Sequence, residues 1–233
     1  MPFTRAAMGF LRGIRKNNNK PWFEAHRADY EEHVREPMRE LIGEMDARFR
    51  KLAPEIGGDP KRSMFRINRD IRFSKDKSPY KTHAACWFHH NRASKQVGSE
   101  AKEGSAGFYF HLEPGASMVG AGLWMPPSSQ LKRLRNAIDE DPSGFERMTR
   151  TLKRFSGLDD GAMLKRMPRG YEETHPAAKW LRYTSFTSGR RLTDAQVTNP
   201  KLGALLEQEF AGLLPLVRWL NEALGYSARI PRS

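Results

Sequence analysis

The stretch RINRDIRFSKDKSPYKTH, from Arg66 to His83, holds a dense group of side chains that could do chemistry. It combines six arginines and lysines with two aspartates and two aromatic rings. Arginine binds a phosphate or carboxylate through two parallel hydrogen bonds, and lysine adds a compact positive charge. The composition of this stretch therefore favours a surface that holds an anion, with a solvated charged loop as the alternative.

Residue types alternate along the first half of this stretch, as they do in a β-strand with one buried face. From Met64 to Phe73, the apolar positions share one side and are predicted to face a core, namely Phe65, Ile67, Ile71 and Phe73. The polar positions share the other side, namely Arg66, Asn68, Asp70 and Arg72. We therefore predict a strand here, and its polar side carries most of the arginines.

The same alternation recurs over residues 83–89, 108–113 and 117–124, which predicts three further strands. Pro114 and Gly115 stand between the last two in the order that a type II turn requires. If these strands are neighbours in one antiparallel sheet, their polar positions extend the same surface. Those positions are His83, Trp87, His89, Tyr109, His111 and Glu113.

A lysine-rich loop follows the first predicted strand. Lys75, Lys77 and Lys81 surround Pro79 and Tyr80, and a loop of this kind at a sheet margin can close over a ligand. It lacks the glycines with which a P-loop brings its backbone against phosphates, so side chains would hold the anion. The predicted ligand-binding residues are Arg66, Asn68, Asp70, Arg72, Lys75, Lys77, Tyr80, Lys81, Trp87, Tyr109 and His111.

Other interpretations of this surface stay open. Arginines that pair with carboxylates across strands would make it an ordinary solvent-facing side of a sheet. His111 with Glu113 or Asp70 would supply the acid and base of an enzyme, so enzymatic activity remains undecided. The same groups together with His83 and His89 could ligate a metal. Their spacing matches no metal motif, however, so we predict no metal site and no particular cofactor.

The segments on either side of the predicted sheet have a helical pattern. Apolar residues recur every three to four positions over 4–16, over 21–52 with an interruption at Pro37, and over 200–224. We predict a single domain over 1–233, helical in 1–55, with an antiparallel sheet in 62–126 and helices in 128–228. The expected fold class is α+β: a four-stranded, mainly antiparallel sheet covered on one face by the N- and C-terminal helices.

The overall charge points to anionic partners. Forty Lys and Arg residues against 27 Asp and Glu give a net charge of +13, which favours a phosphate-containing small molecule first and nucleic acid as the alternative. The single cysteine, Cys86, excludes an internal disulfide and fits a reducing compartment. No apolar run is long enough for a signal peptide or a membrane span, so we expect a cytoplasmic protein without membrane contact. The sequence does not define an oligomeric state.

Four blocks of the sequence, in this order, resemble a known bacterial family. They are NNNKPWFEAHRADYEEHVREPM, FRINRDIRFSKDKSPYKTH, GFYFHLEPG followed by GLWMP, and PRGYEETHPAAKWLR. The family is the domain-of-unknown-function family 2461, a group of conserved hypothetical proteins, and the resemblance covers nearly the whole chain. It implies a single soluble cytoplasmic domain and transfers no catalytic role. The residues that coincide with the central signature of the family are Asn68, Arg69, Asp70, Arg72, Phe73, Lys75, Asp76, Lys77, Pro79, Tyr80 and Lys81.

Overall fold

The N-terminal part of the chain is helical. A computed structural model describes residues 3–72, 75–93, 104–155 and 157–228. The first segments are α1 (Arg5–Lys16), α2 (Lys20–Ala25), α3 (Arg27–Tyr30), the π-helical turn η1 (Glu31–Arg35) and α4 (Glu36–Leu52). Thr4 and Asn19 cap α1 and α2, because the side-chain oxygen of each accepts a hydrogen bond from a backbone amide of the first turn. The sequence predicts an interruption of this helical segment at Pro37. The structure places the irregular turn at η1, just before Pro37, and α4 continues directly from η1.

Five antiparallel strands form one sheet in chain order. They are β1 (Ile56–Gly57), β2 (Ala84–His90), β3 (Gly107–Leu112), β4 (Met118–Leu123) and β5 (Phe186–Arg191). The strands predicted over 83–89, 108–113 and 117–124 are confirmed as β2, β3 and β4. The predicted count of four is wrong, because β1 lies between the predicted helical region 1–55 and the predicted sheet region 62–126, and β5 lies within the predicted helical region 128–228.

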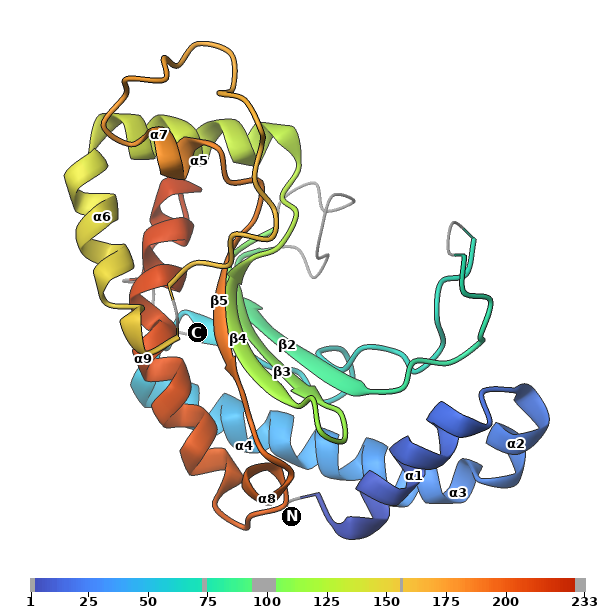
Figure 1. Cartoon of the computed structure of the whole chain (residues 1–233). Helices are drawn as coiled ribbons and strands as arrows, with labels where there is room; N and C mark the ends of the chain where they lie inside the picture. The colour runs from blue at the N-terminus through green and yellow to red at the C-terminus, as the bar shows by residue number, and fades with distance from the viewer. Residues whose placement is uncertain (1–2, 73–74, 94–103, 156, 229–233) are drawn as a thin grey trace.

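The strand predicted over residues 64–73 is also wrong, because the described residues 60–72 and 75–82 form a bent arm. At its base the first limb pairs with β2, where the Phe65 amide donates to the Ala85 carbonyl. Farther out the two limbs pair with each other, where the Lys81 amide donates to the Ile67 carbonyl and the Arg69 amide to the Pro79 carbonyl. The bridges Met64↔Cys86 and Asn68↔Tyr80 do not share one register, so the ladder is interrupted as at a β-bulge. Such an interruption bends a hairpin, and the arm stands apart from the sheet at the right of Figure 1.

The C-terminal part of the chain is mostly helical, with β5 inserted. Its helices are α5 (Ser128–Glu140), α6 (Pro142–Arg150), the 3-10 turn η2 (Lys153–Phe155), α7 (Ala178–Leu181), α8 (Asp194–Val197) and α9 (Leu202–Ala223). Thr193 and Gln196 form a capping box at α8. In Figure 1, α9 runs beside β5 and α4 lies below the curved sheet.

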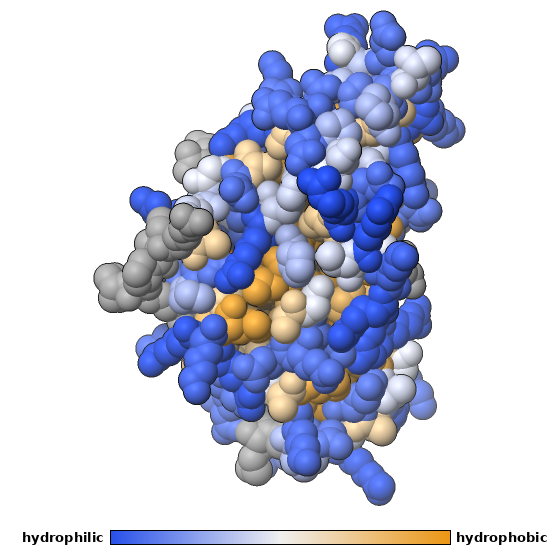
Figure 2. Space-filling model, turned by 90° about the vertical axis from the view of Figure 1, so that its left-hand side faces the viewer, coloured by the Kyte–Doolittle hydropathy of each residue, from blue (hydrophilic) through white to orange (hydrophobic). Residues whose placement is uncertain are grey.

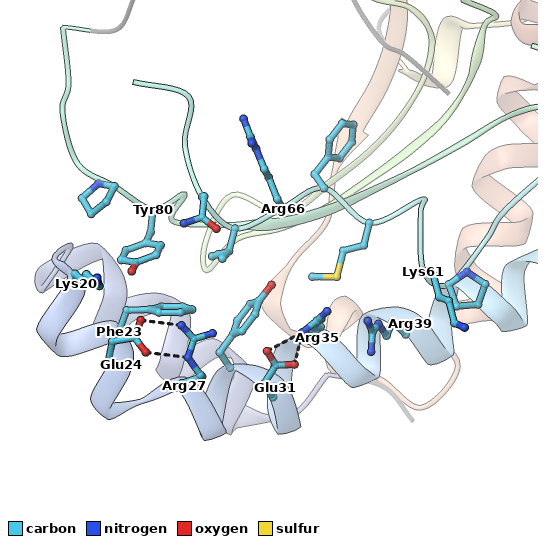
Figure 3. Close-up of a pocket in the computed structure, with 17 residues that line it drawn as sticks. Lys20, Phe23, Glu24, Arg27, Glu31, Arg35, Arg39, Lys61, Arg66 and Tyr80 are labelled. Carbon is cyan, nitrogen blue, oxygen red and sulfur yellow. Dashed lines mark hydrogen bonds and ion pairs between the residues drawn. The ribbon is translucent and has the colours of Figure 1, made fainter. Parts of the chain in front are cut away.

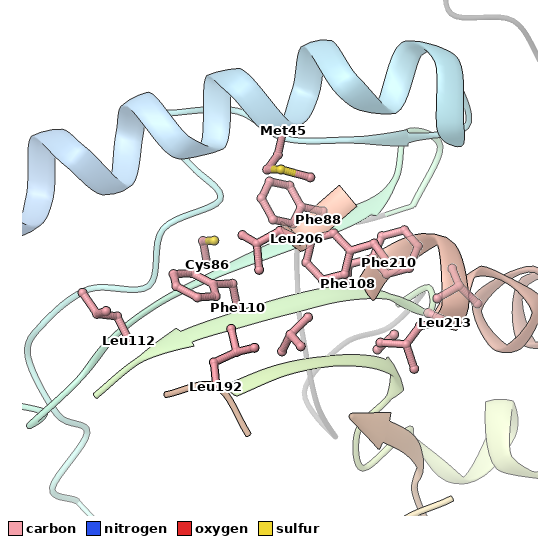
Figure 4. Close-up of a cluster of buried hydrophobic side chains, with 14 of the residues drawn as sticks. Met45, Cys86, Phe88, Phe108, Phe110, Leu112, Leu192, Leu206, Phe210 and Leu213 are labelled. Carbon is pink, nitrogen blue, oxygen red and sulfur yellow. The ribbon is translucent and has the colours of Figure 1, made fainter. Parts of the chain in front are cut away.

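The apolar core lies between α4, α9 and one face of the sheet. The Phe108 ring stacks on Phe210 of α9 at 4.7 Å and on Phe49 of α4 at 5.5 Å. Cys86 is buried on this face, and burial raises the pKa of its thiol. Figure 4 shows these side chains meeting between the two helices and the strands. Because β2, β3 and β4 alternate, Trp87, Tyr109 and His111 lie on the opposite face.

One face of the molecule is mainly hydrophilic (Figure 2). Figure 2 views the side on which α6 lies in Figure 1, and it shows charged and polar residues over most of that face, with a smaller apolar area at its middle. Within the described ranges, no helix combines the length and apolar composition that crossing a lipid bilayer requires.

Candidate functional site

The outer half of the arm carries charged groups that pair with one another. Arg72 donates hydrogen bonds to Asp70, the shortest at 2.6 Å, and these bonds lower the pKa of Asp70 to about 2. Arg69 pairs with Asp76 in the same way. Lys77 donates to the Ile71 carbonyl at 2.9 Å, while Lys75 is exposed. This part of the predicted site is therefore largely self-paired.

The apolar side predicted for this segment is only partly buried. Ile67 is buried at the base of the arm, but Ile71 is exposed, so its assignment to the core is wrong. The arm has bent away from the sheet at this point, which leaves the Ile71 side chain exposed. Phe73 lies outside the described residues.

Tyr80 anchors the arm to the N-terminal helices. Its ring is buried and stacks on Phe23 of α2 with centroids 4.3 Å apart. The side chain of Asn18 holds the Tyr80 backbone from both sides, since its amide donates to the Tyr80 carbonyl at 2.9 Å and its oxygen accepts from the Tyr80 amide at 3.0 Å. These contacts fix the distance between the arm and the helices beneath it.

A pocket of about 640 Å³ lies between the base of the arm and the helices α2 to α4. Figure 3 shows Arg27, Arg35 and Arg39 along the helical wall, with Tyr80 above Phe23 and Lys61 at the far end. Arg66 and Asn68, two predicted ligand residues, also line it, although the Arg66 side chain extends away from the helices. The complete lining is Lys20, Phe23, Glu24, Arg27, Tyr30, Glu31, Arg35, Arg39, Pro60, Lys61, Met64, Phe65, Arg66, Ile67, Asn68, Pro79 and Tyr80.

Positive charge dominates this basic pocket, since six cationic residues and only two with carboxylates line it. Arg27 is held by Glu24 through two hydrogen bonds of 2.7 and 3.0 Å. Arg35 donates to Glu31 through Nη1 alone. Among the described residues, the side chains of Lys20 and Lys61 form no hydrogen bond or ion pair. The pocket can therefore offer an anion several N–H donors that its own glutamates do not occupy.

Sequence reasoning missed the arginines of the helical wall. Arg27, Glu31, Arg35 and Arg39 recur every four positions, which places them along one side of a helix. That spacing can be read from the sequence. However, arginines with glutamates three or four positions away usually form ion pairs on the exposed side of a helix, so the spacing did not indicate a binding site. Only the folded arm turns this stripe into the wall of a pocket.

The remaining predicted residues lie on the open face of the sheet. Trp87 is almost fully buried and pairs across the strands with Tyr109. Lys81 is half-buried with its ammonium group 5.4 Å from the centre of the Phe65 ring, and burial lowers its pKa. The predicted ligand-binding residues thus fall into three places: the outer arm, the basic pocket and this sheet face.

Two histidines and a glutamate meet at one end of that sheet face. His83 and His111 stack with ring centroids 4.2 Å apart, and His111 Nε2 lies 3.0 Å from Glu113 Oε2. The other ring nitrogen of His111, Nδ1, lies 3.0 Å from the Tyr109 hydroxyl. His89 and Asp70, which the sequence also offered as metal ligands, are not part of the group of described residues that could share an ion.

Burial sets the protonation of this cluster. Desolvation by burial, followed by the adjacent His111, lowers the pKa of His83 to about 4, so its imidazole is neutral at physiological pH. Burial also raises the pKa of the Tyr109 hydroxyl, which stays protonated. For Glu113, burial alone would raise the pKa, but hydrogen bonds from His111 and Thr82 outweigh it and the pKa falls. Glu113 is therefore a carboxylate.

These features define an α+β protein with a five-stranded antiparallel sheet and a bent arm that closes one side of a basic pocket. The chain belongs to the family described as conserved hypothetical protein (DUF2461), whose model matches residues 6–219. This match confirms the resemblance found in the sequence. A search of curated proteins and a search of solved structures give no match.

Proposed function

We propose that the protein binds a small phosphate-containing anion in the basic pocket between the arm and the helices α2 to α4. The observation that carries the proposal is the row of arginines at Arg27, Arg35 and Arg39 along a pocket of about 640 Å³. A volume of this order is typical of sites for small organic ligands.

The arginines are held in place before a ligand arrives. Glutamates on the same helical stretch pair with each of them, Glu24 with Arg27, Glu31 with Arg35, and Glu36 with Arg39 at 2.6 Å. A guanidinium has five N–H donors, and each of these pairs uses only one or two of them. The remaining donors can bind phosphate oxygens in the paired geometry that arginine favours. This arrangement lowers the entropy lost when an anion binds.

Aromatic rings support a ligand with an organic part beyond the phosphate. Phe23, Tyr30, Phe65 and Tyr80 line the pocket beside the arginines. Burial raises the pKa of Tyr30 to about 12, so its hydroxyl remains a hydrogen-bond donor. A sugar phosphate or nucleotide would place its phosphate against the arginines and its ring or chain against these side chains.

Thermal unfolding with added anions tests this proposal. We expect a nucleotide or sugar phosphate to raise the Tm of the wild type by about 5–10 °C at a hundred times its Kd, from the linkage of binding to folding. Arg35→Ala should weaken binding by about 10- to 100-fold, because it removes hydrogen bonds between charged groups. Arg72→Ala, a charge-matched substitution outside the pocket, should leave the Tm shift unchanged.

The outcomes separate this proposal from its competitors. If Arg72→Ala removes the Tm shift and Arg35→Ala does not, the outer arm rather than the basic pocket holds the anion. If only a single-stranded oligonucleotide stabilises the protein, equally in both variants and with a steep loss of affinity in salt, the nucleic-acid alternative is correct. If none of the anions shifts the Tm of the wild type, the charged side chains of the pocket and the arm pair only with one another and bind no anion.

A further inference from the structure

The strand register gathers His83, His111 and Glu113 at one end of the open sheet face. Ala85 pairs with His111 and Ala84 with Leu112, so the next pair in this antiparallel register places His83 opposite Glu113. His111 lies near the end of β3, and Glu113 directly follows the strand, two positions on, with its carboxylate beside the His111 ring. One ligand atom from each of the three residues lies within 4.8 Å of those from the other two.

We propose that His83, His111 and Glu113 bind a divalent transition metal of the zinc or ferrous-iron class. Two imidazoles and one carboxylate are a ligand set that such ions use in proteins. Ligand atoms on one tetrahedral ion lie about 3.3 Å apart, given metal–ligand bonds of about 2.0–2.1 Å. The 3.0 Å between His111 Nε2 and Glu113 Oε2 is already close to that separation. A ring nitrogen of His83 lies within 4.8 Å of both of these atoms, so a movement of its side chain toward them would complete the set.

Surrounding groups orient these ligands as an outer shell does in metal sites. Glu113 Oε1 accepts hydrogen bonds from Arg15 at 2.7 Å and from Thr82 at 3.1 Å, which leaves Oε2 directed toward His111. With a metal on Nε2, the other ring nitrogen of His111, Nδ1, faces the Tyr109 hydroxyl at 3.0 Å, which fixes the orientation of the imidazole.

The site is half-buried and sits among cations. His111 and Glu113 keep 13% and 19% of their side-chain surface exposed, which leaves room for a water or a substrate atom on the metal. Arg15 touches Glu113, and the charges of Lys81 and Arg69 act on His83. These positive charges oppose a dication, so the metal alone should bind with moderate affinity, and an anionic co-ligand on the open positions should strengthen its binding.

Cobalt titration of the full chain, without a histidine tag, tests this inference independently of the basic pocket. We expect one equivalent of Co²⁺ to produce visible d–d absorption that Zn²⁺ displaces. His83→Ala and Glu113→Gln should each weaken Co²⁺ binding more than about 100-fold, and Tyr109→Phe about 10-fold, as loss of an outer-shell partner does. His33→Ala, which changes a histidine that does not belong to this group of three residues, should bind Co²⁺ as the wild type does.

Unfolding curves of each variant, recorded by circular dichroism, separate loss of ligand from loss of fold. Glu113→Gln keeps the shape of the side chain, so a folded Glu113→Gln that no longer binds Co²⁺ supports the site. Failure of the wild type to take up one equivalent of Co²⁺ overturns it. Binding of equal strength and identical spectrum in His83→Ala also overturns it.

Discussion

Phe108→Ala is expected to lower the free energy of unfolding by about 3–5 kcal/mol, the usual cost of truncating a buried phenylalanine. The Phe108 ring is fully buried at the centre of the sheet and contacts rings from both α4 and α9. Its removal leaves a cavity between Phe49 and Phe210, which come from helices at opposite ends of the chain. Urea denaturation monitored by circular dichroism measures the loss.

Trp124→Ala is the matched control for this substitution. Trp124 lies directly after β4, and 56% of its surface is exposed. We expect its truncation to change the free energy of unfolding by less than about 0.5 kcal/mol, as for most surface substitutions. A Phe108→Ala variant that loses no more than Trp124→Ala would mean that the contact between the sheet and the two helices is not the main core.

The double variant Arg154→Ala/Arg190→Ala is expected to lose about 3–5 kcal/mol, because it leaves a buried charge without partners. Glu209 of α9 is only 3% exposed and is paired with Arg190 at 2.7 Å and with Arg154 at 2.5 Å. Adding Glu209→Gln to the double variant should recover part of the stability, since it removes the unpaired charge. If Glu209→Gln recovers no stability, the double variant loses stability because the apolar parts of the two arginine side chains no longer pack, and not because a charge is left unpaired.

The same network predicts how this loss depends on pH. Burial would raise the pKa of Glu209, but hydrogen bonds from Arg190 and Arg154 outweigh it and hold the pKa below its ordinary value of 4.5. A carboxylate with a lowered pKa stabilises the fold above its unfolded pKa, and this stabilisation is lost as the pH falls through the folded pKa. The difference in unfolding free energy between wild type and double variant should therefore shrink below about pH 4.5. A difference that is constant from pH 7 to pH 3 would contradict this account.

The central strands could be predicted from the sequence because their signals are local. Residues 108–113 alternate in type, and the turn at Pro114 and Gly115 joins them directly to the next strand. In contrast, β5 has the sequence FTSGRR, in which polar residues and Gly189 hide any alternation. Its position depends on pairing with β4, which lies more than sixty residues earlier. Local pattern carries little information about such a contact.

The arm shows why the predicted ligand surface divides into three. Alternation over 64–73 was real, but the interrupted register between Met64 and Asn68 bends the chain out of the sheet. Arg72 is carried to the outer arm, while Tyr109 and His111 remain on the sheet face. The basic pocket arises only when the arm folds back over α2 to α4, so its wall of arginines could not be assigned from the arm sequence alone.

The position of a bound oxyanion tests the central claim most directly. Tungstate resembles phosphate in shape and charge, and its anomalous scattering locates it without ambiguity in crystals grown free of sulfate and phosphate. We expect a peak in the basic pocket, within hydrogen-bond distance of the guanidinium groups of Arg35 and Arg39 and absent from an Arg35→Ala/Arg39→Ala variant. An empty pocket at saturating tungstate, or a peak only beside Arg72 on the outer arm, would contradict the proposed function.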